Sequence, residues 1–229
     1  MTKFSVIPSG WFFMGSNEGQ SDEQPVHRVW VDAFEMSNYP VTRQEYYKFI
    51  RATGRNTPRE WNNPVFEGAN LPVVGVSWND AMVYCLWHSS TKEFVRLPTE
   101  AEWERAARGF SSHKRYPCGN TIPEWVPKQG KGPLVGPWKV TLGAPNDFGL
   151  YGIGANIHEW CKDWHCKTYY ANSPQTNPQG PSSGIRRASR GGSWRHAITI
   201  STNSGRSKLD PSFGYTDYGF RVVRPHQNG

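Results

Sequence analysis

The chain has 229 residues, of which 36% are hydrophobic and 14% aromatic, and it contains 23 Gly and 18 Pro. This composition excludes a helical bundle and favours a fold rich in irregular loops that large aromatic side chains hold in place. The net charge is +7, but the basic residues are scattered and form no basic helix or stripe, so we expect no nucleic-acid partner.

Short strands are expected at both ends of the chain. The amino-terminal part carries three of them, at 4–7, 11–14 and 26–31, and the last alternates imperfectly between apolar and polar side chains. A closing strand is expected at 220–223.

Three helices are expected to begin at polar caps. Thr42 and Thr99 each begin a capping box, in which the Thr hydroxyl accepts from a backbone N–H and a Glu three residues later reaches back. These boxes predict helices over 42–54 and 99–109, each ending at a glycine. Ser77 begins the remaining helix.

The helix over 99–109 is rich in acidic side chains. Arg96 lies just before it, and Glu100, Glu102 and Glu104 lie within it. Two interpretations stay open: a structural ion pair with Arg96, or a solvated acidic face.

No helix is expected between about 115 and 185. This segment is rich in Gly and Pro and is punctuated by Trp and Tyr. So long an irregular stretch in a compact domain is usually functional or packed by its own side chains.

Several motifs carry a family resemblance across nearly the whole chain. They lie at 10–16, 22–29, 72–81, 96–109, 116–120, 149–151 and 159–164, followed by Gly191-Gly192-Ser193-Trp194 and Gly219-Phe220-Arg221. In this order they resemble the formylglycine-generating enzyme domain, also called the sulfatase-modifying-factor domain. The resemblance implies a single compact α+β domain over 1–229, related to C-type lectins, with little regular secondary structure.

The catalytic metal of that family is not expected here. Formylglycine-generating enzymes resemble one another in holding copper(I) between two cysteines just after the Gly-Gly-Ser motif, and soft thiolates suit copper(I). In this chain Arg195 and His196 occupy that place, and no cysteine follows Cys166. We therefore expect no copper-dependent formylglycine synthesis.

A second branch of the family resembles the sulfoxide synthases of ergothioneine biosynthesis, which use non-haem iron. Their iron-binding histidines come largely from an additional amino-terminal helical domain. This chain begins directly at the shared domain, and His196 alone makes no iron site. A metal-dependent oxidoreductase of either type remains the alternative hypothesis.

The resemblance also implies a calcium-binding turn around 150–160. Calcium takes six to eight oxygen ligands, and the candidates here are Asn156 and Glu159. Gly152 stands where the family carries an acidic or amide ligand, and Ala155 replaces a glycine, so the site is weakened. Calcium is a possible cofactor, and no other cofactor is predicted.

A local cluster places His158, Cys161, His165 and Cys166 within nine residues. Zinc accepts such ligands, but the spacing matches no common zinc module. A disulfide between Cys161 and Cys166, or two free thiols, is the favoured interpretation.

The segment between the two carboxyl-terminal motifs is predicted to bind a ligand. Its small polar residues are typical of adaptable recognition loops on a rigid scaffold. The candidate contacts are Arg195, His196, Ile198, Ile200, Thr202, Asn203, Ser204, Tyr215 and Asp217. Some members of the family resemble the variable proteins of diversity-generating retroelements, which place diversified residues between these same motifs. Two competing interpretations stay open: the whole set is ordinary surface of the domain, or Ile198 and Ile200 form the inward face of a strand.

The leading prediction is therefore a non-catalytic ligand-binding protein. The ligand is a protein or a small molecule that the sequence does not identify, and we expect a monomer. The amino end lacks the continuous apolar region of a signal peptide, and no apolar stretch is long enough to span a membrane. A cytoplasmic location is expected.

Overall fold

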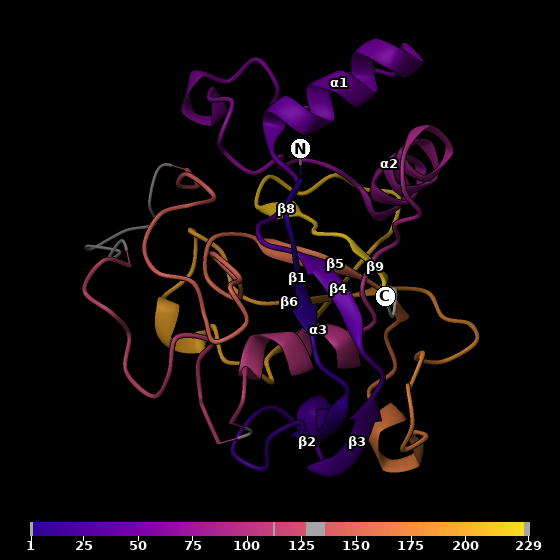
Figure 1. Ribbon diagram of the computed structural model, residues 1–229, viewed down its shortest axis with the longest axis vertical. Coiled ribbons are helices and arrows are strands. Elements are labelled where there is room, and N and C mark those ends of the chain that lie inside the picture. The colour runs from indigo at the N-terminus through magenta and orange to yellow at the C-terminus, as the bar shows by residue number, and fades with distance from the viewer. Residues whose placement is uncertain (1, 112, 127–135, 227–229) are drawn as a thin grey trace.

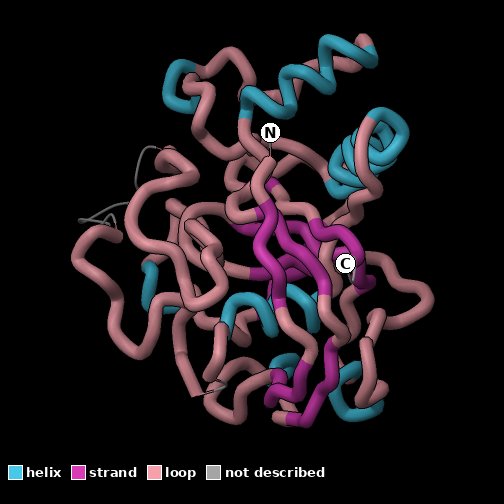
Figure 2. The backbone as a smooth tube through the Cα atoms, viewed as in Figure 1, coloured by secondary structure: helices cyan, strands magenta, loops and turns pink. Residues whose placement is uncertain are grey.

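The computed structural model describes residues 2–111, 113–126 and 136–226. The strands in this part of the chain are β1 (Phe4–Ile7), β2 (Gly10–Met14), β3 (His27–Val31), β4 (Phe34–Ser37), β5 (His158–Trp164), β6 (Arg187–Arg190), β7 (Arg206–Leu209), β8 (Tyr218–Gly219) and β9 (Val223–Pro225). The α-helices are α1 (Arg43–Thr53), α2 (Trp78–Thr91) and α3 (Glu100–Arg108). Loops connect these short elements and make up most of the trace (Figure 2). The expected α+β fold with little regular secondary structure is confirmed.

The strands form three small sheets in the described residues, with orders β1-β4-β9, β2-β3 and β7-β6-β5-β8. In the first sheet, β4 pairs antiparallel with both β1 and β9, so strands from the two ends of the chain lie on either side of β4 in one sheet. Helices α1 and α2 lie at one end of the molecule and the β2–β3 hairpin at the other (Figure 1).

The sequence expectations for the strands hold in part. The strands predicted at 4–7, 11–14 and 26–31 correspond to β1, β2 and β3. The closing strand predicted at 220–223 is wrong in its extent, because the chain forms two short strands there, β8 and β9, on different sheets. The sequence predicts none of the strands β4, β5, β6 and β7.

The helix caps agree with the sequence. Thr42, Ser77 and Thr99 each accept a hydrogen bond from the backbone N–H three residues later, and the side chain of that residue bonds back. Gly54 ends α1 with φ 69°, in the left-handed region that glycine tolerates best. The 115–185 segment contains no α-helix among its described residues, as expected, but it holds strand β5.

The acidic face of α3 is buried, which corrects the interpretation as a solvated face. Glu100, Glu102 and Glu104 are only 2%, 7% and 0% exposed. Glu100 pairs with Arg206 at 2.6 Å, and Glu104 pairs with Arg108 at 2.6 Å and with Arg190. Buried charges of this kind persist only when they are paired. The ion pair expected between Arg96 and Glu102 is present, at 2.6 Å.

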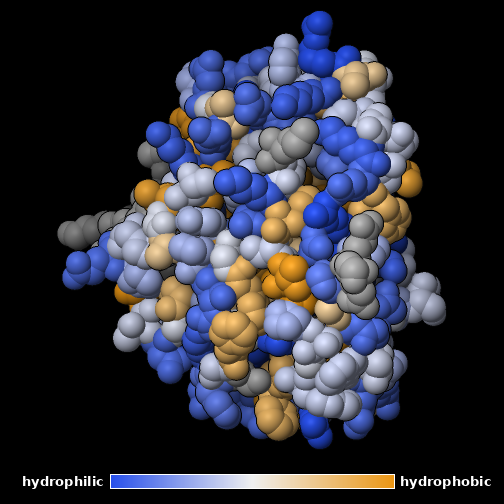
Figure 3. Space-filling model, viewed as in Figure 1, coloured by the Kyte–Doolittle hydropathy of each residue, from blue (hydrophilic) through white to orange (hydrophobic). Residues whose placement is uncertain are grey.

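The exposed large hydrophobic side chains in the described residues come from many parts of the sequence, from Val6 to Phe213. The face drawn in Figure 3 is mostly polar and is interrupted by small apolar areas. Within the described residues, no helix has the length and apolar character needed to cross a membrane.

Asp22 provides a test of how buried charge affects stability. Its carboxylate accepts from His165 Nε2 and Lys208 Nζ, both at 3.1 Å. Burial raises the pKa of Asp22, but the hydrogen bonds from Lys208 and His165 and the charges of Lys208 and Arg206 outweigh it, so the pKa is lowered. A carboxyl with a lowered folded pKa stabilises the protein above its unfolded pKa, and this contribution is lost as the pH falls through the folded value.

We therefore expect Asp22→Asn to lower the free energy of unfolding at pH 7 and to have a smaller effect at pH 3. Urea unfolding at a series of pH values between 7 and 3 measures this difference. The exposed Glu18→Gln is the control and should change little across the range. An equal loss at both ends of the range for Asp22→Asn would show that the carboxylate charge is not responsible.

Candidate functional site

The predicted ligand-binding segment consists of an exposed run between two buried flanks. Gly192, Ser193 and Trp194 are buried on one side, and Ser201, Asn203 and Ser204 are buried on the other. Between them Arg195, His196, Ala197, Thr199 and Ile200 are exposed, while the side chain of Ile198 lies outside the described structure.

Close backbone approaches hold the two flanks together. A Cβ at Gly192 would lie 1.9 Å from Ser201 Oγ, so only glycine fits there. The Gly192 N–H donates to the Gly154 carbonyl at 3.0 Å, and the Trp194 N–H donates to the Asn156 carbonyl at 2.9 Å. The base of the exposed run is therefore fixed to the 154–156 turn.

The structure does not bring all the predicted contacts to one surface. Asn203 is 1% exposed, and its amide nitrogen donates to the Lys114 carbonyl at 2.8 Å, so it supports the loop instead of contacting a ligand. Ser204 is 5% exposed and, with Thr202, lines a separate open depression near Gly15 and Arg108.

Of two further predicted contacts, one lies away from the exposed run and one lies in it. Tyr215 is half-buried and packs against Trp160 and Tyr218 in an aromatic cluster. Ile200 is 62% exposed, so the alternative that it faces inward on a strand is wrong.

Arg195, His196 and Asp217 do come together, and His158 joins them. Asp217 Oδ2 lies 3.6 Å from His196 Nε2 and 3.9 Å from His158 Nε2. Arg195 Nη1 lies 3.8 Å from Asp217 Oδ1, and Ser193 Oγ donates to Asp217 Oδ2 at 2.7 Å. The Asp217 carboxylate is therefore surrounded by four side chains, those of His158, Ser193, Arg195 and His196.

The sheet positions two members of this group. Strand β5 pairs in parallel with β8, and His158 stands opposite Tyr218, the residue after Asp217. The His158 ring stacks on the Tyr218 ring, with centroids 4.6 Å apart. Burial lowers the pKa of His158 to about 4 despite the opposing charge of Asp217, so its imidazole is neutral at pH 7.

Sequence reasoning placed His158 in the wrong cluster. Cys161 is buried, and His165 pairs with Asp22 across the molecule instead of turning toward Cys161. Both Cys161 and Cys166 are free thiols, so the disulfide alternative is wrong. His158 lies beside Asp217 because strand β5 pairs with β8, which the sequence alone does not show.

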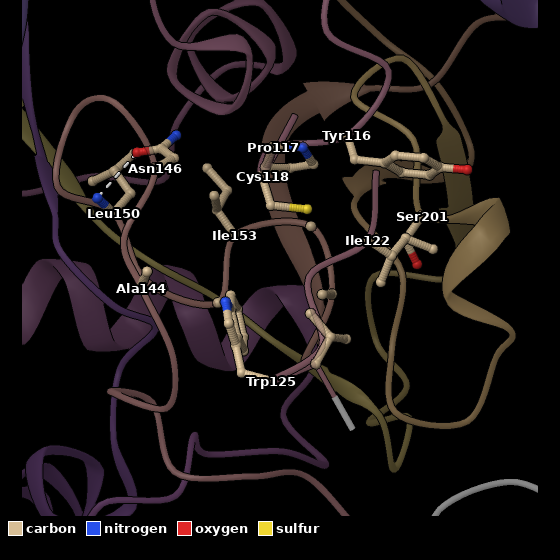
Figure 4. Close-up of a pocket in the computed structure, with 14 residues that line it drawn as sticks. Tyr116, Pro117, Cys118, Ile122, Trp125, Ala144, Asn146, Leu150, Ile153 and Ser201 are labelled. Carbon is tan, nitrogen blue, oxygen red and sulfur yellow. Dashed lines mark hydrogen bonds between the residues drawn. The ribbon is translucent and has the colours of Figure 1, made fainter. Parts of the chain in front are cut away.

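An apolar pocket adjoins the exposed run at Ser201. Its walls include Cys118, Ile122, Trp125 and Ile153, with Ser201 at its edge (Figure 4). The Tyr116 hydroxyl, in the same wall, donates to the Thr199 carbonyl at 3.2 Å. This hydrogen bond links the pocket to the exposed run.

The two calcium candidates are engaged in internal contacts. Glu159 is fully buried, and its oxygens accept from Arg221 at 2.6 and 2.8 Å and from the Trp103 indole at 2.7 Å. Asn156 exchanges hydrogen bonds with the backbone of Trp138 at 2.8 and 3.1 Å. A calcium ion at Glu159 would have to displace the Arg221 guanidinium, and calcium binding there stays a prediction.

Comparison with known proteins assigns the chain. A family model described as the sulfatase-modifying factor enzyme 1-like domain matches residues 1–226. The chain belongs to this family.

Relatives within the family carry different names. The chain is 34% identical to the serine/threonine-protein kinase pkn1 of Chlamydia pneumoniae over 98% of its own length, but it spans only 38% of that protein. It is also 34% identical to the formylglycine-generating enzyme of Streptomyces coelicolor, covering 95% of this chain and 87% of that enzyme. The structure of Treponema denticola variable protein 1 matches with a TM-score of 0.82 and 25% identity, covering 97% of this chain and 95% of that one.

The copper site that the family resemblance implies does not fit these residues. The side chains after Gly-Gly-Ser are a guanidinium and an imidazole, and the group around Asp217 contains no thiol. Of the four cysteines, Cys85 and Cys161 are buried. The donors at this position are nitrogen and carboxylate oxygen, which are not the soft ligands that copper(I) prefers.

Proposed function

We propose that this family domain is a non-catalytic ligand-binding module whose recognition surface is the exposed run 195–200 above Asp217. The observation that supports this most directly is the burial pattern: solvent-exposed side chains stand on a base that is buried on both sides. Exposed loops on a fixed scaffold carry recognition because their side chains can change at little cost to the fold.

The surroundings of the run support binding. The side chains of Arg195 and His196 are 49% and 43% exposed, and Ile200 adds an exposed apolar side chain. The apolar pocket around Trp125 adjoins the run at Ser201, but its volume of about 30 Å³ admits no more than a methyl-sized part of a ligand. We also propose that this run tolerates changes of sequence. The structural match to Treponema denticola variable protein 1 supports this part of the proposal.

Replacing Arg195, Thr199 and Ile200 together by Ala tests the proposal. We expect each change to alter the free energy of unfolding by no more than about 0.5 kcal/mol, because these side chains are exposed. When both proteins are applied to arrays of immobilised glycans and peptides, the wild type should bind some of these compounds. The triple variant should lose that binding.

A matched variant distinguishes the run from its base. Asn203→Ala removes a buried hydrogen bond and should lower the thermal midpoint, in contrast with the triple variant. A triple variant that keeps every array signal of the wild type, or that unfolds as readily as Asn203→Ala, would contradict the proposal.

Metal-dependent oxidation is the second candidate function. The identity to a protein named formylglycine-generating enzyme favours it, and the missing thiol pair opposes it. Incubation with a cysteine-containing peptide and copper should produce no aldehyde, and mass spectrometry of the peptide measures this. Aldehyde formation that depends on His196 would favour the enzyme instead.

A further inference from the structure

We propose that His158, His196 and Asp217 bind a divalent first-row transition-metal ion, such as Zn²⁺ or Fe²⁺. This site goes beyond the proposed function, because it does not depend on which ligand the exposed run recognises. One donor atom from each of the three residues lies within 4.8 Å of the other two.

The distances are close to those of a coordination shell. Metal–nitrogen and metal–oxygen bonds of about 2.1 Å place tetrahedral ligand atoms roughly 3.4 Å apart. The Nε2 atoms of His196 and His158 lie 3.6 and 3.9 Å from Asp217 Oδ2. The donor atoms of the two histidines are separated by at most 4.8 Å, so the His196 ring would have to move inward by up to about 1 Å to reach tetrahedral spacing, and its exposed position permits such a movement.

Two of the ligands are held in place before any ion binds. His158 is 8% exposed and lies in β5, and Asp217 is 5% exposed and precedes β8. Ser193 Oγ donates to the Asp217 carboxylate at 2.7 Å. Hydrogen bonds to ligating groups of this kind orient them and raise metal affinity.

The third ligand leaves the site open. The His196 side chain is 43% exposed, and its backbone N–H donates to the Ser193 carbonyl at 3.0 Å. Three protein ligands with a free position toward solvent are typical of sites that bind an exchangeable molecule, whereas structural zinc sites have four protein ligands.

The donor chemistry selects the class of metal. Two imidazoles and one carboxylate suit zinc, iron, nickel and copper(II). Calcium and magnesium require mainly oxygen ligands, and copper(I) requires the thiolates that this place lacks. Arg195 lies 3.8 Å from Asp217, but its side chain is exposed enough to turn away from a bound dication.

Cobalt titration tests the site, because Co²⁺ reports its ligands through its visible absorption. Metal-free protein, prepared by dialysis against a chelator, is titrated with Co²⁺ and Zn²⁺ while the absorption and the heat of binding are followed. We expect saturable binding of one ion, with a rise in the thermal midpoint as the ion stabilises the folded state.

Three variants make the test specific. His196→Ala should weaken binding by about 100-fold or more without altering the circular dichroism spectrum, because His196 is exposed. Ser193→Ala should weaken binding by about 10–100-fold, as expected for a residue that orients a ligand. His113→Ala changes another exposed histidine and should bind as the wild type does.

Two results would overturn the proposal. One is a wild-type protein that binds neither Co²⁺ nor Zn²⁺ at millimolar concentration. The other is a His196→Ala variant that binds either ion as tightly as the wild type and the His113→Ala control.

Discussion

Glu104→Gln is expected to lower the free energy of unfolding by about 3–5 kcal/mol, because it breaks a buried ion-pair network. Glu104 is fully buried and accepts hydrogen bonds from Arg108 at 2.6 and 2.8 Å and from the Gly15 N–H at 2.9 Å. It also pairs with Arg190, which is itself fully buried.

The electrostatics explain the size of the effect. Burial raises the pKa of Glu104, but the charges of Arg108 and Arg190 outweigh it and lower the pKa, so the carboxylate is ionised at neutral pH. A glutamine has nearly the same volume but carries no charge. Arg190 would then keep only Glu100, whose carboxylate lies 3.6 Å away, as a paired anion.

Urea unfolding of the two proteins at pH 7 measures this loss. Arg55→Ala is the control, because the Arg55–Asp80 pair is 42% and 34% exposed and exposed pairs contribute only about 0–1 kcal/mol. A loss for Glu104→Gln no larger than that of Arg55→Ala would show that the network does not stabilise the fold.

Arg221→Met is expected to cost a similar amount, about 3–5 kcal/mol. Arg221 is fully buried and donates to both oxygens of Glu159 and to the carbonyls of Ser37 and Tyr151, the last two at 3.1 Å. It thereby joins β4 and β5 to the segment between β8 and β9. Methionine would fill part of the space but leave the Glu159 carboxylate buried without a cation.

A double variant separates the loss of the pair from the loss of the arginine. In Arg221→Met with Glu159→Gln, the uncompensated charge is removed while a glutamine oxygen still accepts from the Trp103 indole. We expect the double variant to be more stable than the sum of the two single losses predicts, and denaturant unfolding of all four proteins measures this. Strictly additive losses would contradict a direct Arg221–Glu159 interaction.

The local features of the fold could be predicted from sequence because they depend on residues a few positions apart. The capping boxes at Thr42, Ser77 and Thr99 involve a cap and a residue three positions later, and all three lie where the sequence places them. The buried flank Gly192-Ser193-Trp194 before the run 195–200 could likewise be predicted, because Gly-Gly-Ser-Trp is a local motif.

The candidate site could be predicted only in part. Arg195, His196 and Asp217 were expected on one surface, and the structure brings them together. The sequence does not place His158 in this site, because its partner Asp217 lies far along the chain. The local residue pattern around 158 carries no information about which strand will pair with it. Asn203 was assigned to the surface from its polarity, whereas its amide is used inside the loop.

By itself the sequence determined the family, the helix starts and the absence of a thiol pair after Gly-Gly-Ser. The tertiary structure alone decided that the acidic face of α3 is buried, because Arg190 and Arg206 reach it from β6 and β7. It also decided that His158 lies beside Asp217, through the β5–β8 pairing. The physical reason is the same in both cases: caps and turns are set by neighbouring residues, but burial and coordination are set by whichever distant segment packs alongside.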